Sequence, residues 1–158
     1  MRYKAAFLFI FILFHPAILN AWEGKVVSVI DGDTIKVLSK GIQVKVRLFA
    51  IDCPEKGQPW NKKAKQFTSL LVLHKTVTVL PVDEDQYGRI VAWVFIEEIN
   101  INKALLRAGL AWHYRQYSND SLLTSLEMEA QVEKKGIWSE PFPVPPWVWR
   151  KMRRNNSD

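Results

Sequence analysis

The sequence predicts an α+β fold, in which five short strands form a Greek-key barrel with about three helices packed on it. Alternating valine and isoleucine residues run through the first half, with glycine-containing turns between the runs. Apolar residues at helical spacing predict one helix between the third and fourth strands and two helices after the fifth strand. A five-stranded barrel with this order of elements is an OB-fold. A plain α+β sandwich is the alternative.

The first three strands form a meander joined by tight turns. They are expected at Lys25–Ile30, Thr34–Leu38 and Ile42–Phe49. Asp31-Gly32 and Ser39-Lys40-Gly41 are typical turn sequences, and they separate the three runs. In the third run, apolar residues alternate with polar and charged ones, which predicts a strand with one buried face.

Two more strands and a helix follow the meander. The helix comes first, because Ala64, Phe67, Leu70 and Leu71 recur at helical spacing on one side. The strands are expected at Thr76–Val82 and Arg89–Ile96, on either side of a polar loop.

Capping residues place the last two helices. Asn100 is a suitable cap for a short helix that ends near Gly109. Asp120 or Ser121 is a suitable cap for a longer helix that ends near Gly136.

The N-terminus has the pattern of an export signal. Arg2 and Lys4 precede an unbroken apolar run over residues 5–14, Pro16 follows, and Leu19-Asn20-Ala21 offers a cleavage site after Ala21. The run is shorter than the roughly 20 residues of a membrane-spanning helix. We therefore predict a signal peptide over residues 1–21 and a secreted or periplasmic protein without stable membrane association after cleavage. The alternative is an uncleaved anchor, which would give a membrane-tethered surface protein.

The remaining chain is expected to hold one OB-fold domain and a tail. The domain covers residues 22–140, a length that suits a single modest core, and we expect it to be a monomer. The tail, residues 141–158, is rich in proline, tryptophan and basic residues. Such a tail either contacts nucleic acid through stacking and charge or lies as a strap on the domain with a frayed basic end. We prefer the strap.

Composition limits the function classes without selecting one. The formal charge of +6, two units of which come from Arg2 and Lys4, suits a polyanionic partner but is common among soluble proteins. The single cysteine, Cys53, excludes an internal disulfide. We interpret Cys53 as a buried small hydrophobe; a cysteine nucleophile, which would need His74 or His113 as a base, is the alternative. We interpret His113 as a structural histidine.

Three short runs place acidic and guanidinium groups at the ends of predicted strands. They are Asp31-Gly32-Asp33-Thr34, Arg47 with the following Asp52-Cys53-Pro54-Glu55, and Tyr87-Gly88-Arg89. Carboxylate oxygens bind hard cations, and arginine forms bidentate hydrogen bonds with phosphate. Each run alone is more simply explained as a solvated turn or a surface residue. Together they favour metal-assisted cleavage of nucleic acid.

These runs resemble the thermonuclease family, the staphylococcal-nuclease-like enzymes. The matching segments are Val29–Ile35, Val46–Glu55, Asp85–Arg89 and Asn102–Ala111, and the resemblance covers roughly residues 25–138. It implies the same OB-fold, and it implies calcium as the metal.

The resemblance also implies roles for individual residues at the metal. Asp33 and Asp52 match direct calcium ligands, and Cys53 matches a residue that binds calcium through its backbone carbonyl. The family often has threonine at this last position, but any residue supplies a carbonyl. Asp31 matches an acidic position that acts on the metal through water. Glu55 matches the glutamate that activates or orients the attacking water.

The implied substrate contacts lie further along the chain. Arg47 and Arg89 match the two arginines that bind the scissile phosphate, and Tyr87 matches a tyrosine that contacts phosphate. Tyr117 matches a tyrosine of the substrate pocket, and Tyr114 is placed to stack on a base.

We therefore predict a calcium-dependent nuclease that acts on DNA and RNA. Hydrolysis of the phosphodiester is expected to show low sequence specificity, because phosphate contacts carry no base information. The resemblance implies products with 3′-phosphate ends. The alternative is an OB-fold module that binds single strands without cutting them. That alternative does not explain Asp33, Asp52 and Glu55, which would repel phosphate without a metal ion.

Overall fold

The computed structural model describes residues 20–155. Residues 1–19 of the predicted signal peptide lie outside this range. Within it, no helix combines the length and the apolar character needed to cross a membrane. The strands are β1 (Trp22–Val29), β2 (Thr34–Ser39), β3 (Ile42–Leu48), β4 (Ile51–Asp52), β5 (Thr76–Glu84), β6 (Ile90–Ile96), β7 (Ile99–Asn100) and β8 (Trp112–His113). The helices are α1 (Asn61–Val72), α2 (Ile101–Arg107), α3 (Ser121–Val132) and α4 (Pro146–Asn155), with a 3-10 helix η1 (Gly136–Ser139).

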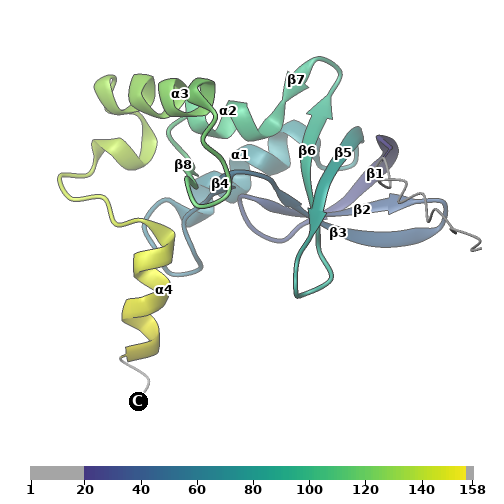
Figure 1. Ribbon diagram of the computed structural model, residues 1–158, viewed down its shortest axis with the longest axis horizontal. Helices are drawn as coiled ribbons and strands as arrows, with labels where there is room; N and C mark the ends of the chain where they lie inside the picture. Colours follow the sequence, from purple (N-terminus) through teal and green to yellow (C-terminus); the bar gives the residue numbers. More distant parts are fainter. Residues whose placement is uncertain (1–19, 156–158) are drawn as a thin grey trace, which may run out of the picture.

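Strands β1, β2, β3, β5 and β6 form a closed barrel (Figure 1). The order β3-β2-β1-β5-β6 is antiparallel throughout, and a parallel pairing between β3 and β6 completes the barrel. Val46 lies opposite Ile90 in that closing pair. The predicted α+β class and the five-stranded OB-fold barrel are therefore confirmed.

Branched aliphatic side chains fill the interior of the barrel. The alternation predicted for β2 and β3 is present over most of their length, because Ile35, Val37, Val46 and Leu48 are all buried, whereas Ile42 at the start of β3 is exposed. The core continues onto α2 and α3, where Leu105 and other leucines are buried. The β-branched residues suit the pleated surface of strands, and the leucines suit the helices.

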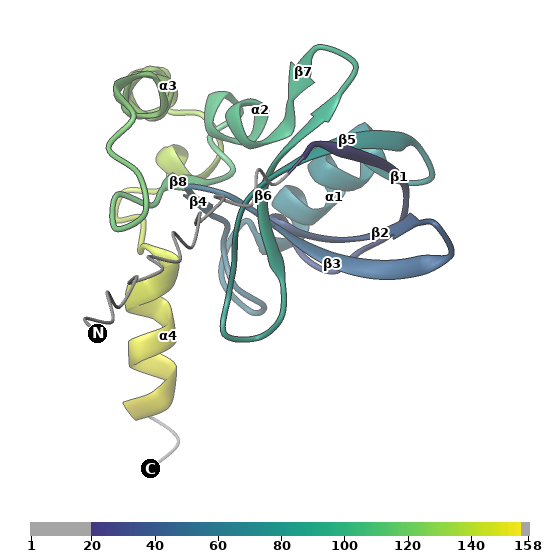
Figure 2. The same cartoon turned by 45° about the vertical axis from the view of Figure 1, so that its right-hand side comes forward.

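Helices α1 and α2 pack against the barrel, α1 beside β1 and α2 beside β6 (Figure 2). Asn100 caps α2 as predicted, because its side chain accepts a hydrogen bond from the Lys103 N–H at 3.0 Å. Asn102, on the first turn of α2, is fully buried and donates to the carbonyls of Phe49 and Ala92 at 2.9 and 3.2 Å. A buried amide whose hydrogen bonds are satisfied in this way fixes the helix on the barrel.

Several strand boundaries differ from the prediction. β1 begins at Trp22, three residues earlier than expected, because Trp22 pairs with Val79 of β5. β5 continues to Glu84, which pairs with Ile90 beyond an irregularity near Pro81. The two-residue strands β4 and β8 pair with each other and were not predicted, because two residues are too few for periodicity to indicate a strand.

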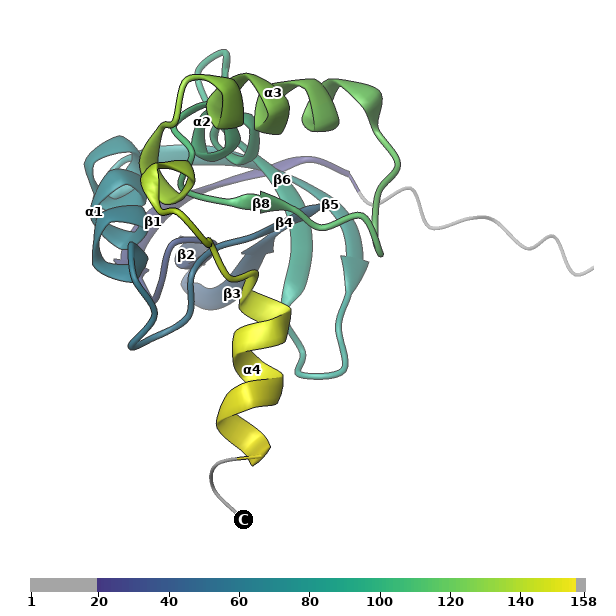
Figure 3. The same cartoon turned by 90° about the vertical axis from the view of Figure 1, so that its left-hand side faces the viewer.

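The C-terminal tail differs most from the prediction. We expected a strap with a frayed basic end, but Pro146–Asn155 forms helix α4. Proline is common at the first position of a helix, where its missing N–H has no partner to lose. In Figures 1 to 3, α4 projects from the body of the fold, with its first turns nearest to it.

Candidate active site at one end of the barrel

Asp33 lies in a tight turn between β1 and β2. The Asp33 N–H donates to Asp31 Oδ1 at 3.2 Å. The Ile30 N–H donates to the Thr34 carbonyl at 2.9 Å and closes the turn. An aspartate that accepts a hydrogen bond from the backbone two residues later is typical of turns. Asp31 thus shapes the turn that presents the Asp33 carboxylate.

Gly32 packs this turn tightly against the rest of the domain. A Cβ at this position would lie 2.8 Å from Ala64 Cβ of α1 and 2.8 Å from Cys53 Sγ. Thr68 Oγ1 of α1 donates to the Gly32 carbonyl at 2.6 Å. The turn is therefore held between α1 and the segment that carries Cys53.

Arg47 joins two buried carboxylates. Its Nη1 donates to Asp33 Oδ1 and its Nη2 donates to Asp52 Oδ1, both at 2.7 Å. Asp33 Oδ2 accepts a further hydrogen bond from the Cys53 N–H at 2.7 Å. Asp33 is 2% exposed and Asp52 is fully buried. The structure thus brings together Asp33, Arg47 and Asp52 at one end of the barrel.

Burial and mutual repulsion shape the protonation of these groups. Burial raises the pKa of Asp33 to about 6, because the opposing charge of Arg47 offsets it only in part and Asp31 adds to the rise. Burial also raises the pKa of Asp52. Burial alone would lower the pKa of Arg47, but Asp33 and Asp52 outweigh it and the pKa is raised. A nearby cation would therefore stabilise the ionised form of both carboxylates.

Glu55 lies just outside this cluster, beyond Pro54. The Glu55 N–H donates to Gln58 Oε1 at 2.9 Å. The Glu55 side chain pairs with Arg150, whose Nη1 donates a short hydrogen bond to Glu55 Oε1. Arg150 Nη2 also donates to Asp52 Oδ2 at 2.9 Å. A guanidinium from α4 thus enters the site.

Arg89 and Tyr87 belong to the loop between β5 and β6. Arg89 Nε donates to Asp85 Oδ2 at 2.7 Å, and the Arg89 Cζ lies 5.6 Å from the centre of the Tyr87 ring. Arg89 comes two residues before Val91, which pairs with Arg47 in the barrel. The register places Arg89 just before the strand that pairs with Arg47. The Arg89 side chain pairs with Asp85 and does not join the ion pairs that Arg47 forms with Asp33 and Asp52.

Asp85 organises that loop. Its carboxylate accepts hydrogen bonds from the N–H groups of Tyr87 and Arg89 at 2.9 and 3.1 Å. Burial would raise the pKa of Asp85, but these bonds and the Arg89 side chain outweigh burial and lower it. Asp85 therefore holds Arg89 in place as an ionised partner.

Tyr114 and Tyr117 lie beside α4. The Tyr114 ring stacks on the Trp147 ring, with centroids 5.1 Å apart and an angle of 1° between the planes. Tyr117 meets Tyr114 edge-on at 4.9 Å and is 61% exposed. Next to the stack is an open hollow of about 360 Å³. Its lining residues are His113, Tyr114, Arg115, Gln116, Trp147 and Lys151.

Cys53 is a buried small hydrophobe in this structure. The residue is 3% exposed and belongs to the core. Burial raises the pKa of its thiol well above the ordinary value, and the neighbouring carboxylates add to the rise. A thiol with a raised pKa carries little of the reactive thiolate, so the nucleophile alternative is not supported.

His113 is buried, as expected of a structural histidine. Its backbone N–H donates to Glu127 Oε1 at 2.9 Å, and its ring Nδ1 lies 3.2 Å from Thr124 Oγ1. Burial lowers the pKa of the ring, and the charge of Arg115 adds to this effect.

The donors fit a hard divalent cation only if the backbone and water take part. In the part of the chain that the structure describes, no three Asp, Glu, His or Cys side chains meet closely enough to hold an ion. Asp33 and Asp52 supply two carboxylates, whereas calcium takes about six to eight oxygens. Carbonyl and water oxygens commonly complete such sites. The purely oxygen character of this set suits calcium better than zinc.

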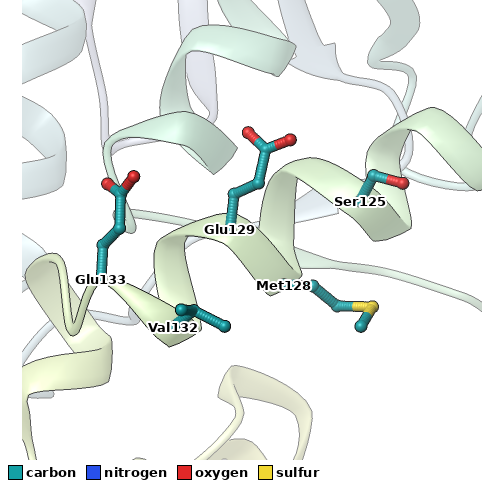
Figure 4. A pocket seen from close by; sticks show the side chains of 5 residues that line it. All are labelled: Ser125, Met128, Glu129, Val132 and Glu133. Carbon is teal, nitrogen blue, oxygen red and sulfur yellow. The ribbon is translucent and has the colours of Figure 1, made fainter.

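A second hollow of about 360 Å³ lies on α3 (Figure 4). It is lined by Ser125, Met128, Glu129, Val132 and Glu133. All five belong to the surface of one helix or its C-terminal cap, and none is a predicted site residue. This hollow therefore has no part in the candidate active site.

Arg150 and Trp147 are the site residues that sequence reasoning missed. Both were assigned only to a basic, tryptophan-rich tail. The proline pair before Trp147 breaks regular structure upstream, but it also indicates the start of a helix. Recognising that helix would have placed an arginine near its middle, but not beside Asp52.

Comparison with protein families gives a match over most of the domain. Residues 45–140 match the family model described as staphylococcal nuclease homologue. The matched span includes Arg47, Asp52, Glu55 and Arg89, and it begins after Asp33.

Curated proteins of three bacteria are similar to this chain. An Escherichia coli protein named uncharacterized endonuclease is 43% identical over 147 residues, or 92% of this chain and 96% of the relative. A Haemophilus influenzae protein of the same name is 38% identical over 133 residues, or 84% of this chain and 75% of the relative. The micrococcal nuclease of Shigella flexneri is 36% identical over 149 residues, or 85% and 86% of the two chains.

Proposed function

The chain belongs to the staphylococcal nuclease homologue family, and from this we propose that it is a calcium-dependent nuclease. It hydrolyses phosphodiester bonds of DNA and RNA with low sequence specificity and leaves 3′-phosphate ends. Its relatives include proteins named endonuclease and micrococcal nuclease. We further propose that it is exported to the periplasm or the medium, as a monomer without stable membrane association.

One observation carries the proposal: Arg47 links the buried carboxylates of Asp33 and Asp52. Buried charges are costly unless they are paired, so a purely structural role would favour apolar residues here. A site that binds both a cation and a phosphate needs negatively and positively charged side chains next to each other. The cluster supplies them.

The calcium ion would be held by Asp33, Asp52 and the Cys53 carbonyl, with Asp31 acting through water. When bound, the ion supplies positive charge that stabilises the negative charge of the transition state. Extracellular calcium modules function with Kd values of about 10⁻⁴–10⁻³ M, so a site with few side-chain donors suits an exported protein.

Residues of this chain carry out the remaining steps of the reaction. Glu55 orients a water molecule and accepts its proton as the water oxygen attacks phosphorus in line. The bond from phosphorus to the 5′ oxygen breaks, the 5′ oxygen leaves with the bonding electrons and takes up a proton from solvent, and the phosphate stays on the 3′ oxygen. Arg47 and Arg89 donate hydrogen bonds to the phosphate oxygens, and these bonds strengthen as negative charge develops.

Two exposed tyrosines suit the binding of a nucleic-acid chain. Tyr87 is 74% exposed and Tyr117 is 61% exposed, so both rings are open to a ligand. Stacking of bases on such rings tolerates any base and favours unpaired strands. This supports a preference for accessible single strands without a preference for sequence.

A cleavage assay tests the proposal. Purified mature protein is incubated with plasmid DNA, denatured DNA and RNA, first with calcium and then with an excess of chelator. We expect cleavage only with calcium, and fragments whose 3′ ends support primer extension only after phosphatase treatment. Binding to single strands without cleavage at any calcium concentration would instead indicate the non-catalytic OB-fold module. N-terminal sequencing of the exported form tests cleavage after Ala21.

A further inference from the structure

Arg150 holds two of the proposed catalytic carboxylates at once. Its Nη2 donates to Asp52 Oδ2 at 2.9 Å, and its Nη1 donates to Asp52 Oδ1 at 3.3 Å and to Glu55 Oε1. Its side chain is 36% exposed, twice the 18% of Arg47, which also donates to Asp52. Arg150 is thus the more accessible of the two guanidinium groups on this carboxylate.

Contacts other than these ion pairs keep α4 beside the site. Trp147 stacks on Tyr114 and meets Trp112 edge-on at 5.8 Å. Upstream of the helix, Gln58 Nε2 donates to the Val144 carbonyl at 2.6 Å. Arg150 therefore remains near the cluster even when other groups take its carboxylate partners.

Both oxygens of Asp52 accept hydrogen bonds from arginine. Oδ1 accepts from Arg47 and Arg150, and Oδ2 accepts from Arg150. A cation that binds Asp52 must compete with these hydrogen bonds. A phosphate that binds the displaced guanidinium removes the competitor. By linkage, cation and phosphate binding then promote each other.

We propose that Arg150 is a third phosphate-binding arginine, which moves from Asp52 and Glu55 to the scissile phosphate and so couples substrate binding to calcium binding. This inference rests on the proposed nuclease function. The move also frees Glu55 for its water. The ion pairs join three carboxylates to two guanidinium groups. Their net charge is therefore −1. A bound divalent cation changes this net charge to +1, and the single negative charge of a phosphodiester neutralises it.

The test combines two measurements on Arg150→Gln and Arg150→Lys. The first is calcium affinity without nucleic acid, measured by isothermal titration calorimetry. Because Gln removes the competing guanidinium, we expect Arg150→Gln to bind calcium about three- to tenfold more tightly than wild type. The second is kcat/KM on denatured DNA at saturating calcium, which we expect to fall about 10- to 100-fold. Lys keeps the charge without the planar fork, so Arg150→Lys should give smaller changes in both.

Arg154→Gln is the matched control, because it removes the same charge from the exposed last turn of α4. It should change either quantity by less than about twofold. Circular dichroism and thermal unfolding verify that each variant is folded.

The outcomes separate the two proposals. Tighter calcium binding with unchanged or higher kcat/KM would mean that Arg150 only competes with calcium, and it would overturn the proposed phosphate contact. Unchanged or weaker calcium binding by Arg150→Gln would show that Arg150 does not compete with calcium for Asp52, and it would overturn the proposed coupling. A wild-type protein that does not cleave with calcium would overturn the nuclease function itself, and this inference with it.

Discussion

The Asp33 carboxylate accepts a hydrogen bond from the Cys53 N–H at 2.7 Å, although the two residues are 20 positions apart. This bond joins the turn before β2 to the segment that carries Asp52 and Glu55. It leaves Asp33 Oδ1 for Arg47, which in turn reaches Asp52. The two acidic runs therefore form one site because a backbone amide and a guanidinium connect them.

Gly32 is needed for that connection, so Gly32→Ala should weaken it. The new Cβ would lie 2.8 Å from the Cβ of both Ala64 and Cys53, and one of these segments must shift. We expect a loss of about 1–3 kcal/mol in the free energy of unfolding, as for other overpacked cores, together with weaker calcium binding. Urea unfolding and calorimetry measure the two effects. Gly41→Asn is the control, because Gly41 has open space around it and Asn tolerates its positive φ.

Arg47→Lys and Arg89→Lys should each lower turnover by well over tenfold at unchanged fold. Lysine keeps the charge but cannot donate two parallel hydrogen bonds to a phosphate. Initial rates on denatured DNA at saturating calcium measure the effect, and circular dichroism verifies the fold. Arg107→Lys, an exposed change at the end of α2, is the control. Near-normal rates for either site variant would count against its assignment.

The convergence of Asp33, Arg47 and Asp52 was predictable because it depends on local strand pairing. Thr34 lies opposite Arg47 in the antiparallel β2–β3 pair, and the register follows from a short turn and an alternating apolar pattern. Asp52 follows the same strand within a few residues. Periodicity and turn residues are sufficient to place all three at one end of the barrel.

The contact between Arg150 and Glu55 was not predictable in this way. The two residues are 95 positions apart, and no repeating pattern encodes the path of the proline-rich segment between α3 and α4. The pairing of β4 with β8 was not predictable from the sequence either, because each strand has only two residues. Tertiary contacts, not local propensity, determine both.

Glu55→Gln should separate water activation from metal binding. The change removes a carboxylate that orients the attacking water, so we expect kcat to fall at least about 100-fold. Calcium affinity should change by less than about threefold, because Glu55 is not proposed as a direct ligand. Single-turnover cleavage and calorimetry measure the two quantities, with the exposed Glu98→Gln as control. A large loss of calcium affinity would instead make Glu55 a ligand.

His113 should make the stability of the domain depend on pH. Burial, reinforced by Arg115, lowers the pKa of the folded histidine below its ordinary 6.5, so the unfolded chain binds protons more readily. The stabilising effect is therefore complete above pH 6.5 and is lost as the pH falls through 6.5 towards the lowered folded pKa. We expect His113→Gln to lose less stability than wild type between pH 7.5 and 5.5, measured by urea unfolding at each pH. Titrating carboxylates such as Asp33 are present in both proteins, so their effect cancels in the comparison. His74→Asn, which removes an exposed histidine, controls for the loss of an imidazole. An equal loss of stability in His113→Gln and wild type would show that this ring does not cause the pH dependence.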